Sequence, residues 1–484
     1  MERADVIIIG AGLLGCFAAR NLAALDLRTV VLEAREDVCT GISKANTGII
    51  YSGCDTRPGT LKTELCVKGS LDFPRLCREL DVPFRPCGSL MVSFGPVGDE
   101  TLRKKYRQGL ENGVPGLALL DREEVLEKEP VLSPGVTLGL WAPTAGTVDP
   151  WALGIAAFEN AAANGVAFRF REEVLSLRRA DGGFLVETVR GSYAAKAVLN
   201  CAGAMADKVR EFTEKPFVRI FPNGADYLVL DRNVPGCPSH ILFQETETGK
   251  GVTLVPTVDG NLLVGPTERE GCSGATTAQG LVELYELASR VVPALPLDRV
   301  IRCFGAVRPN PFYVEADGRA QARSISNFTV LEEDGLFSLI GIKTPGLTCA
   351  PGLGEYVAGK IAAWLGCGKK NPAFDPVRRG IRPVRDLGEE ERAALIREKP
   401  EYGQLVCRCR EVTLGEIREA IRRGAVSVDG VKRRTGAGMG RCQGGRCLQT
   451  VLEEVSRGTG VPVCAVEKDG GGSRMIVEEN SGTV

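Results

Sequence analysis

The sequence predicts an α/β fold with a parallel sheet, an inserted mixed α+β region and a small helical C-terminal domain. The first observation is an apolar run at 4–10 (ADVIIIG), followed by a helical apolar pattern and a second apolar run at 28–34 (RTVVLEA). The second is the return of such runs at 197–203 (AVLNCAG) and 336–342 (LFSLIGI). The third is a change to Pro, Gly and charge after residue 367, before a short region with helical patterns.

Size and composition indicate a globular protein of more than one domain. The chain has 484 residues, of which 44% are hydrophobic and 25% charged. A formal net charge of −1 gives no basic face for nucleic acid. We find neither an apolar window of about 18–20 residues nor a signal peptide. We therefore expect a cytoplasmic protein, with association at the inner face of the membrane left open.

The cysteine and histidine counts constrain the chemistry. Seventeen cysteines in a large chain without a signal peptide favour metal binding or redox chemistry over disulfides. The single histidine, His240, excludes a zinc site built on paired histidines. His240 lies in a strand-like segment with no motif around it, and we expect it to be structural.

A glycine motif separates the first strand from the first helix. Gly10, Gly12 and Gly15 form G-x-G-x-x-G, and Glu33 stands at the end of the next strand. This context predicts a dinucleotide site, in which the helix N-terminus meets the pyrophosphate and the carboxylate meets a ribose hydroxyl. A glycine turn without a ligand is the alternative. The expected contacts are Gly10, Gly12, Leu13, Leu14, Gly15, Glu33 and Ala34.

Five further segments resemble the D-amino-acid-oxidase-like superfamily of FAD enzymes. They are 40–69 (beginning TGISKANTGIIYSGC), 200–209 (NCAGAMADKV), 255–267 (VPTVDGNLLVGPT), 305–309 (GAVRP) and 341–357 (GIKTPGLTCAPGLGEYV). Within that superfamily the sequence is most similar to anaerobic glycerol-3-phosphate dehydrogenases and L-2-hydroxyglutarate oxidases. The resemblance implies further FAD contacts at Ser43, Asn46, Thr47, Gly48, Val174, Ala202, Gly203, Gly341, Gly346, Leu347 and Thr348.

Two cysteine pairs near the C-terminus indicate a second redox centre. Cys407 and Cys409 form C-x-C, and Cys442 and Cys447 form a second pair later in the chain. The surrounding sequence resembles the [2Fe–2S] domain of bacterioferritin-associated ferredoxin over about 403–457, which implies that these four thiolates are the ligands. A four-thiolate zinc site is the alternative that spacing leaves open. Arginines at 408, 410, 441 and 446 could offset the negative charge of the cluster.

These observations predict a domain plan. An FAD-dependent oxidoreductase domain at 1–370 has FAD-binding parts at about 1–80, 145–215 and 325–370, and substrate parts at about 80–145 and 215–325. A linker at 371–402, the [2Fe–2S] domain at 403–457 and a tail at 458–484 complete it.

The substrate residues follow from the same resemblance. Arg308 matches a position where the superfamily places an arginine against a substrate anion, and Lys343 lies in the turn that faces the flavin. Lys62 is a weaker candidate of the same kind. Tyr51 stands where related sequences commonly have histidine, which removes the easy base for an alcohol proton.

We therefore expect an FAD-dependent dehydrogenase of a small anionic CH–OH substrate, of the glycerol 3-phosphate or 2-hydroxy acid type. Its electrons would leave through the [2Fe–2S] cluster to a partner protein or quinone. Two alternatives stay open here: oxidation of an amino acid or other amine on the same fold, and a non-catalytic electron-transfer or scaffold subunit.

Overall fold

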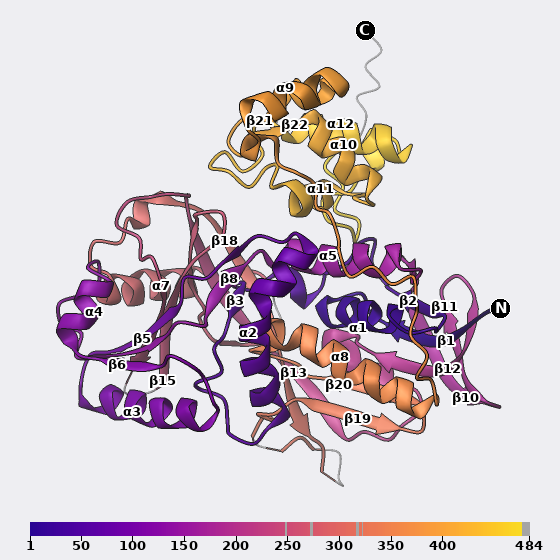
Figure 1. Ribbon diagram of the computed structural model, residues 1–484, viewed down its shortest axis with the longest axis horizontal. Coiled ribbons are helices and arrows are strands. Elements are labelled where there is room, and N and C mark those ends of the chain that lie inside the picture. Colours follow the sequence, from indigo (N-terminus) through magenta and orange to yellow (C-terminus); the bar gives the residue numbers. More distant parts are fainter. Residues whose placement is uncertain (247–248, 272–273, 316–318, 322, 477–484) are drawn as a thin grey trace. The chain divides into compact units, whose positions relative to one another are not determined.

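The computed structural model describes residues 1–246, 249–271, 274–315, 319–321 and 323–476 (Figure 1). The chain divides into two compact units. The first comprises Met1–Leu32 and Cys39–Arg378, and the second comprises Glu33–Val38 and the chain from Arg379 onward. No helix within the described ranges is both long and apolar enough to cross a membrane.

The first unit contains the predicted parallel sheet. Its strand order is β10-β11-β12-β1-β2-β9, and β20 pairs with β12 beyond the end of β11. Five neighbouring strands run parallel: β20 (Leu336–Ile340), β12 (Ser192–Asn200), β1 (Glu2–Ile9), β2 (Thr29–Leu32) and β9 (Ala167–Arg169). The remaining strands are β10 (Val174–Ala180), β11 (Gly183–Thr188) and β19 (Thr329–Glu333).

Side chains on β1 explain why this sheet is central. Val6, Ile7 and Ile8 are fully buried, as expected for a parallel strand covered on both faces. Helix α1 (Leu13–Ala23) packs against α5 (Pro150–Ala163) and α8 (Gly346–Trp364), and α2 (Leu61–Leu80) packs on α8. The short α6 (Ala206–Arg210) follows β12.

A second sheet of the first unit forms the region predicted to bind substrate. Its order is β17-β13-β16-β15-β14-β5-β7-β6, with β18 paired to β13 along almost its whole length. Its strands are β5 (Ser89–Ser93), β6 (Ala118–Leu120), β7 (Leu138–Ala142), β13 (Val218–Leu230), β14 (Ile241–Thr246), β15 (Gly249–Pro256), β16 (Leu262–Gly265), β17 (Arg269–Glu270) and β18 (Val300–Tyr313). A turn at Asp259 and Gly260 joins β15 to antiparallel β16.

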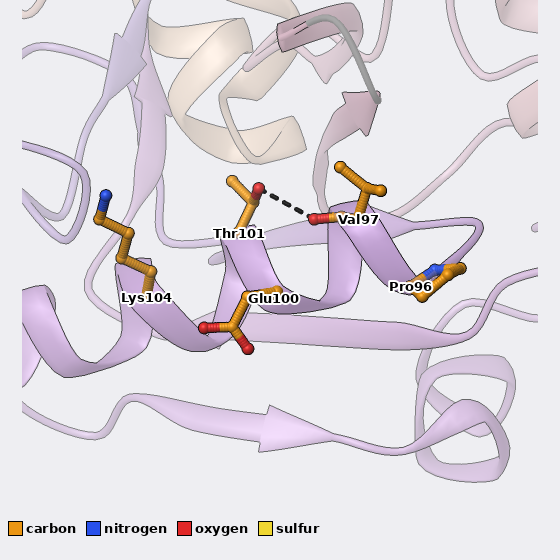
Figure 2. Close-up of a pocket in the computed structure, with 5 residues that line it drawn as sticks. All are labelled: Pro96, Val97, Glu100, Thr101 and Lys104. Atoms are coloured by element: carbon orange, nitrogen blue, oxygen red, sulfur yellow. Dashed lines mark hydrogen bonds between the residues drawn. The ribbon is translucent and has the colours of Figure 1, made fainter.

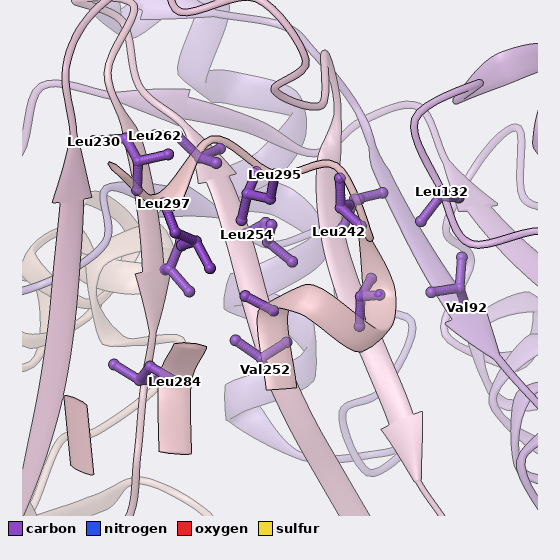
Figure 3. Packing of buried hydrophobic residues seen from close by; sticks show 14 of the residues in the cluster. Val92, Leu132, Leu230, Leu242, Val252, Leu254, Leu262, Leu284, Leu295 and Leu297 are labelled. Carbon is purple, nitrogen blue, oxygen red and sulfur yellow. The ribbon is translucent and has the colours of Figure 1, made fainter. Parts of the chain in front are cut away.

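An aliphatic cluster holds this second sheet against its helices (Figure 3). Leu242, Val252, Leu254 and Leu262 from the strands meet Leu284 of α7 (Ala278–Val291). Helices α3 (Pro96–Glu111) and α4 (Arg122–Lys128) pack on the same sheet. A small sheet of β3 (Ile49–Ile50), β8 (Gly146–Val148) and β4 (Phe84–Arg85) is also present.

The second unit is mostly helical. It contains the hairpin β21 (Leu405–Cys407) and β22 (Val412–Thr413), and the helices α9 (Glu389–Glu398), α10 (Leu414–Arg422), α11 (Val428–Thr435) and α12 (Leu448–Thr459). Its core includes Val412, Ile417, Val431 and Val455. The helical patterns expected in the C-terminal region are confirmed, because α10, α11 and α12 lie there.

The second unit extends beyond the predicted cluster domain at both ends. The expected linker 371–402 contains α9, and Ile381 packs on the core while Arg385 Nη1 donates to Arg410 O at 2.8 Å. In the expected tail, Val466 is a core residue and Ile476 packs against it. These segments are rich in charged and polar residues, yet some of their apolar side chains, Val466 among them, are buried. The end of the expected tail, 477–484, lies outside the described residues.

Candidate functional site

The predicted FAD residues follow the carboxyl ends of adjacent parallel strands. Gly10 follows β1, Ala202 and Gly203 follow β12, Gly341 follows β20 and Glu33 follows β2. Ligands of open α/β sheets bind at this edge, outside the carboxyl ends of the strands. Segments from the beginning, the middle and the end of the first unit are thus brought to one edge by the sheet order β20-β12-β1-β2.

Two glycines of the turn, Gly10 and Gly15, leave no room for a side chain. Gly10 has φ +100°, and a Cβ there would lie 2.6 Å from the carbonyl oxygen of Cys201. A Cβ on Gly15 would lie 2.0 Å from the carbonyl oxygen of Gly10. The turn therefore brings backbone N–H groups at the start of α1 close to a ligand, as a pyrophosphate requires.

The loop after residue 40 is held by its own polar side chains. Ser43 Oγ accepts from the backbone N–H of Leu13 at 3.1 Å, which ties the loop to the start of α1. Asn46 Nδ2 donates to Ser43 O at 2.7 Å, and its Oδ1 accepts from Gly48 N at 2.8 Å. Thr47 lies between these residues and is half-buried. The loop predicted to follow the pyrophosphate is therefore anchored to the glycine turn.

The start of α8 is joined to the same region through Thr348. Its buried hydroxyl accepts from the backbone N–H of Tyr51 at 3.0 Å and donates to Ile49 O at 3.3 Å. Gly346 and Leu347 form the first turn of α8, whose N–H groups carry partial positive charge. Gly341 has φ +64° and its Cβ position lies 2.4 Å from Pro311, so a larger residue would not fit.

Three cations converge near the junction of β18 and the β20–α8 turn. The pKa of Lys343 is lowered from its ordinary value by burial and by the positive charges of Lys62 and Arg308, and the negative charge of Glu268 opposes this shift. Lys343 Nζ donates to Asn310 Oδ1 and to Ser324 Oγ, each at 3.1 Å. The amine is thus oriented by neutral oxygen atoms. A cluster of positive charge held in this way is suited to a small dianion.

Lys62 reaches the cluster from another element. Its Nζ donates to Ser326 O at 3.1 Å and lies 5.8 Å from the centre of the Phe328 ring. The three cations therefore come from α2, β18 and the β20–α8 turn.

An aromatic wall borders the cations. Tyr51 stacks on Phe243 with ring centres 5.7 Å apart, and Tyr227 stacks on Phe304 at 4.8 Å. Burial raises the pKa of Tyr227, the nearby Tyr51 phenol raises it further, and Arg308 opposes the shift. The Tyr227 phenol therefore stays protonated and can donate a hydrogen bond.

Tyr227 and Asn310 belong to this site but escape prediction from the sequence. They lie on β13 and β18, which pair antiparallel so that Asn223 faces Arg308 and Tyr227 faces Phe304. That register joins residues that are distant in the sequence, and no local motif marks either residue. Val174, also predicted to contact FAD, lies outside the sequence motifs. It begins β10 and packs against an apolar cluster of the sheet.

The four C-terminal cysteines form two close pairs. Cys409 Sγ lies 3.6 Å from Cys442 Sγ, and the Cys447 thiol donates to Cys407. That hydrogen bond, with backbone N–H groups that include those of Gly438 and Arg410, lowers the pKa of Cys407 to about 5. Across the described residues, no group of three or more His, Cys, Asp or Glu side chains is arranged around one point as metal ligands would be.

Local structure explains how distant cysteines meet. Cys407 ends β21, and Cys447 immediately precedes α12. A Cβ on Gly440 would lie 2.2 Å from Cys409 Cβ, so glycine allows the second cysteine loop to approach the first. Four thiols surrounded by backbone donors have the chemistry that a thiolate-ligated cluster needs.

Two other features lie outside this chemistry. His240 Nδ1 is 2.5 Å from buried Glu129 Oε1 and its ring meets Trp141 edge-on at 5.0 Å, which fits the structural role expected for it. A surface hollow on α3 is lined by Pro96, Val97, Glu100, Thr101 and Lys104 (Figure 2). The dashed bond there joins Thr101 Oγ1 to Val97 O at 3.0 Å within the helix, and none of the predicted site residues lines the hollow.

Comparison with known proteins gives two family matches. Residues 5–360 match the family described as FAD dependent oxidoreductase, and residues 405–457 match the BFD-like [2Fe-2S] binding domain. A protein of Caloramator mitchellensis named glycerol 3-phosphate dehydrogenase is 39% identical over 98% of each chain. A protein of Escherichia coli K12 named as one subunit of anaerobic glycerol-3-phosphate dehydrogenase is 26% identical over 92% of this chain and 86% of its own.

Solved structures agree with the fold. L-α-glycerophosphate oxidase of Mycoplasma pneumoniae with FAD bound superposes with a TM-score of 0.70 at 25% identity, covering 78% of this chain and 98% of its own. The glycerol-3-phosphate dehydrogenase of Bacillus halodurans shares the fold with a TM-score of 0.64 at 17% identity, covering 94% and 90% of the two chains.

The glycine cradle at Gly10 and Gly15 and the two cysteine pairs fit the groups that these families bind. The FAD family model covers most of the first unit, and the iron–sulfur model falls within the second. The chain belongs to the FAD-dependent oxidoreductase family and carries a C-terminal [2Fe–2S]-binding domain.

Proposed function

We propose that the protein oxidises glycerol 3-phosphate at its secondary alcohol. The observation that carries this proposal is the contact of Lys343 Nζ with Asn310, two residues after Arg308 on β18, in a place where the charge of Lys62 also acts on the amine. A phosphate dianion matches this surplus of positive charge better than a monocarboxylate. Relatives named for glycerol 3-phosphate, one of them 39% identical over 98% of both chains, support the same choice of substrate.

FAD, when bound, supplies a two-electron acceptor that takes the hydride from the carbinol carbon. We assign its pyrophosphate to the N-terminus of α1 with Ser43, Asn46, Thr47 and Gly48, and its adenosine ribose to Glu33. Gly341, Gly346, Leu347 and Thr348 are assigned to the ring end, where the first turn of α8 favours negative charge.

The protein's own side chains then have separate tasks. Arg308 and Lys343 bind the phosphate and fix the distance from the anion to the alcohol carbon. The phenols of Tyr51 and Tyr227 lie within electrostatic reach of each other and of Arg308. We assign hydrogen bonds with the substrate oxygen to Tyr51 Oη and Tyr227 Oη, and the alcohol proton is released to solvent as the hydride leaves. The stacked Phe243 and Phe304 rings limit access of water.

Electrons leave, in this proposal, through a cluster held by Cys407, Cys409, Cys442 and Cys447 to a partner protein and onward to quinone. The similarity to a relative named as one subunit of a dehydrogenase supports a protein partner. A cytoplasmic place, at the inner face of the membrane when the partner is bound, remains part of the prediction.

Anaerobic mixing with candidate substrates tests the proposal. Glycerol 3-phosphate should bleach the bound flavin within the mixing experiment, whereas glycerol, which lacks the anion, should not. L-2-Hydroxyglutarate tests the carboxylate alternative, and glycine and L-proline test the amine alternative. Bleaching by an amino acid but not by glycerol 3-phosphate would overturn the proposal, and no bleaching by any of them would favour a non-catalytic subunit.

A further inference from the structure

The edge of the cysteine site differs from its interior. Cys407 and Cys447 are buried, whereas Cys409 and Cys442 are partly exposed and lie 3.6 Å apart. A group held by all four sulfur atoms would approach the surface on the Cys409 and Cys442 side. An electron carrier must come close to that edge, because transfer requires a short distance to the redox group.

Exposed arginines accompany this edge. Arg408, Arg441 and Arg446 are exposed, and each immediately precedes one of the cysteines. Arg410 differs, because its side chain is buried and its carbonyl oxygen accepts from Arg385. The two cysteine loops, 405–413 and 436–449, contain these four arginines and a single acidic residue, Glu411.

Several arginines elsewhere in the same unit are paired with carboxylates. Arg418 lies 2.8 Å from Glu454, and Arg423 lies 2.6 Å from Glu419. Arg408 and Arg446, by contrast, form no ion pair with any residue that the structure describes. Exposed Leu405, with 52% of its surface accessible, lies on the strand that leads to Cys407. A positive rim with an apolar residue beside it is typical of a protein-binding surface.

We propose that Arg408, Arg441 and Arg446, around Cys409 and Cys442, form the docking surface for an electron-carrier protein with an acidic face. This inference rests on the proposed function in one respect: the electrons released by substrate oxidation must pass to a carrier. Oxidation of one alcohol releases two electrons, so a one-electron carrier docks twice for each substrate molecule. Complementary charge speeds such encounters and makes them sensitive to salt.

The arginines could instead only offset the charge of the cluster, and binding measurements separate the two roles. The probe is rubredoxin, a small acidic carrier, with zinc in place of iron so that it binds without redox chemistry. Calorimetry with the full-length holoprotein at low salt should show binding that weakens as salt is raised. Cytochrome c, a basic carrier, should bind more weakly than rubredoxin.

Charge reversal gives the sharper test. Arg408→Glu combined with Arg446→Glu should weaken zinc rubredoxin binding by at least about tenfold at low salt, because each position changes from attraction to repulsion. The matched control is Arg397→Glu with Lys399→Glu, at exposed positions outside the cysteine loops, which makes the same change in net charge. The control should bind within about twofold of the parent, since screening limits distant charges.

Electron transfer to native carriers provides a second reading. The reversal variant should reduce iron rubredoxin more slowly and cytochrome c faster than the parent. A role limited to the potential of the cluster would move both rates in the same direction. Equal binding of zinc rubredoxin to the parent and the reversal variant, or rates that change together, would overturn the docking surface. If the parent protein did not oxidise glycerol 3-phosphate, the proposed substrate would be wrong. The binding results with zinc rubredoxin would still test the docking surface.

Discussion

The cofactor region and the substrate region of the first unit are specified in different ways. The cofactor region uses contiguous motifs at strand ends: Gly10 to Gly15 after β1, and Gly341 to Thr348 after β20. The substrate region that we propose uses Lys62, Arg308 and Lys343, which come from three elements and are brought together only by the fold. Backbone groups dominate the first region and long charged side chains dominate the second.

This difference indicates how each region can change during evolution. A glycine turn must stay intact because any side chain would strike backbone, as the 2.0 Å gap at Gly15 shows. A cation on a strand can be exchanged without refolding the sheet, so substrate preference can vary on a constant flavin fold. Mutations should therefore affect cofactor content in the first region and substrate affinity in the second.

The largest expected effect concerns the cysteine pairs. Cys442→Ser with Cys447→Ser should abolish iron and labile sulfide binding, because two of the four thiolate ligands are lost. Turnover with a protein acceptor should fall to background, whereas glycerol 3-phosphate should still bleach the flavin once. Metal and sulfide analysis with anaerobic stopped-flow absorbance measures both. Cys464→Ser in the same unit is the control, and full turnover by the double variant would contradict the electron path.

The glycine turn should give the next largest effect. Gly15→Val places atoms against the Gly10 carbonyl, which lies 2.0 Å from the Cβ position, so α1 must move away from the ligand. The purified variant should lack FAD, as its absorbance near the flavin bands will show. Gly191→Ala, where nothing lies within 4 Å of the Cβ position, should retain FAD. A variant that keeps FAD at full occupancy would place the pyrophosphate elsewhere.

The sequence predicts much of the first region because its signals are local. The strand, glycine turn, helix and Glu33 follow one another directly at the start of the chain. Tyr227 was missed because its place opposite Phe304, on the strand pair that carries Arg308, depends on the register of β13 and β18. The extent of the second unit was missed because its flanks contribute only a few core residues, such as Ile381 and Val466, to charged and polar segments.

Arg308 tests the difference between the cofactor region and the substrate region, because its replacement should weaken substrate binding without loss of FAD. Arg308→Ala should lower kcat/KM for glycerol 3-phosphate by an amount equivalent to about 2–5 kcal/mol, the usual cost of breaking a desolvated charge pair. Flavin content should not change. Arg302→Ala, at an exposed position on the same strand, is the matched control. Equal steady-state kinetics for the two variants would show that the anion is bound elsewhere.

Glu33 tests the cofactor region at a side chain rather than at the backbone. Glu33→Ala should weaken FAD binding by about 1.5–3 kcal/mol, as expected for hydrogen bonds to a charged group. Glu33→Gln keeps an oxygen acceptor and should lose less. Titration of deflavinated protein with FAD, followed by flavin fluorescence, gives both dissociation constants. If the alanine variant bound FAD as tightly as the parent, the ribose would not be held by this carboxylate.

The smallest effect should be a pH dependence that arises from Lys343. Burial and the charges of Lys62 and Arg308 lower the pKa of this amine, so it loses its proton at a lower pH than an ordinary lysine, which titrates near about 10.4. The protonated form binds the phosphate, and KM should therefore rise as the pH increases through the lowered pKa. The same shift makes the folded state bind fewer protons than the unfolded state, so this residue's contribution to stability grows as the pH rises. Two cations remain after deprotonation, and we expect the loss in binding to be no more than about 1.5 kcal/mol, the low end for a hydrogen bond to a charged group.

Lys343→Arg keeps its charge at every pH used and should remove the alkaline rise in KM, whereas Lys62→Arg should keep it. An identical KM profile in the parent and the Lys343→Arg variant would show that this amine does not contact the substrate anion.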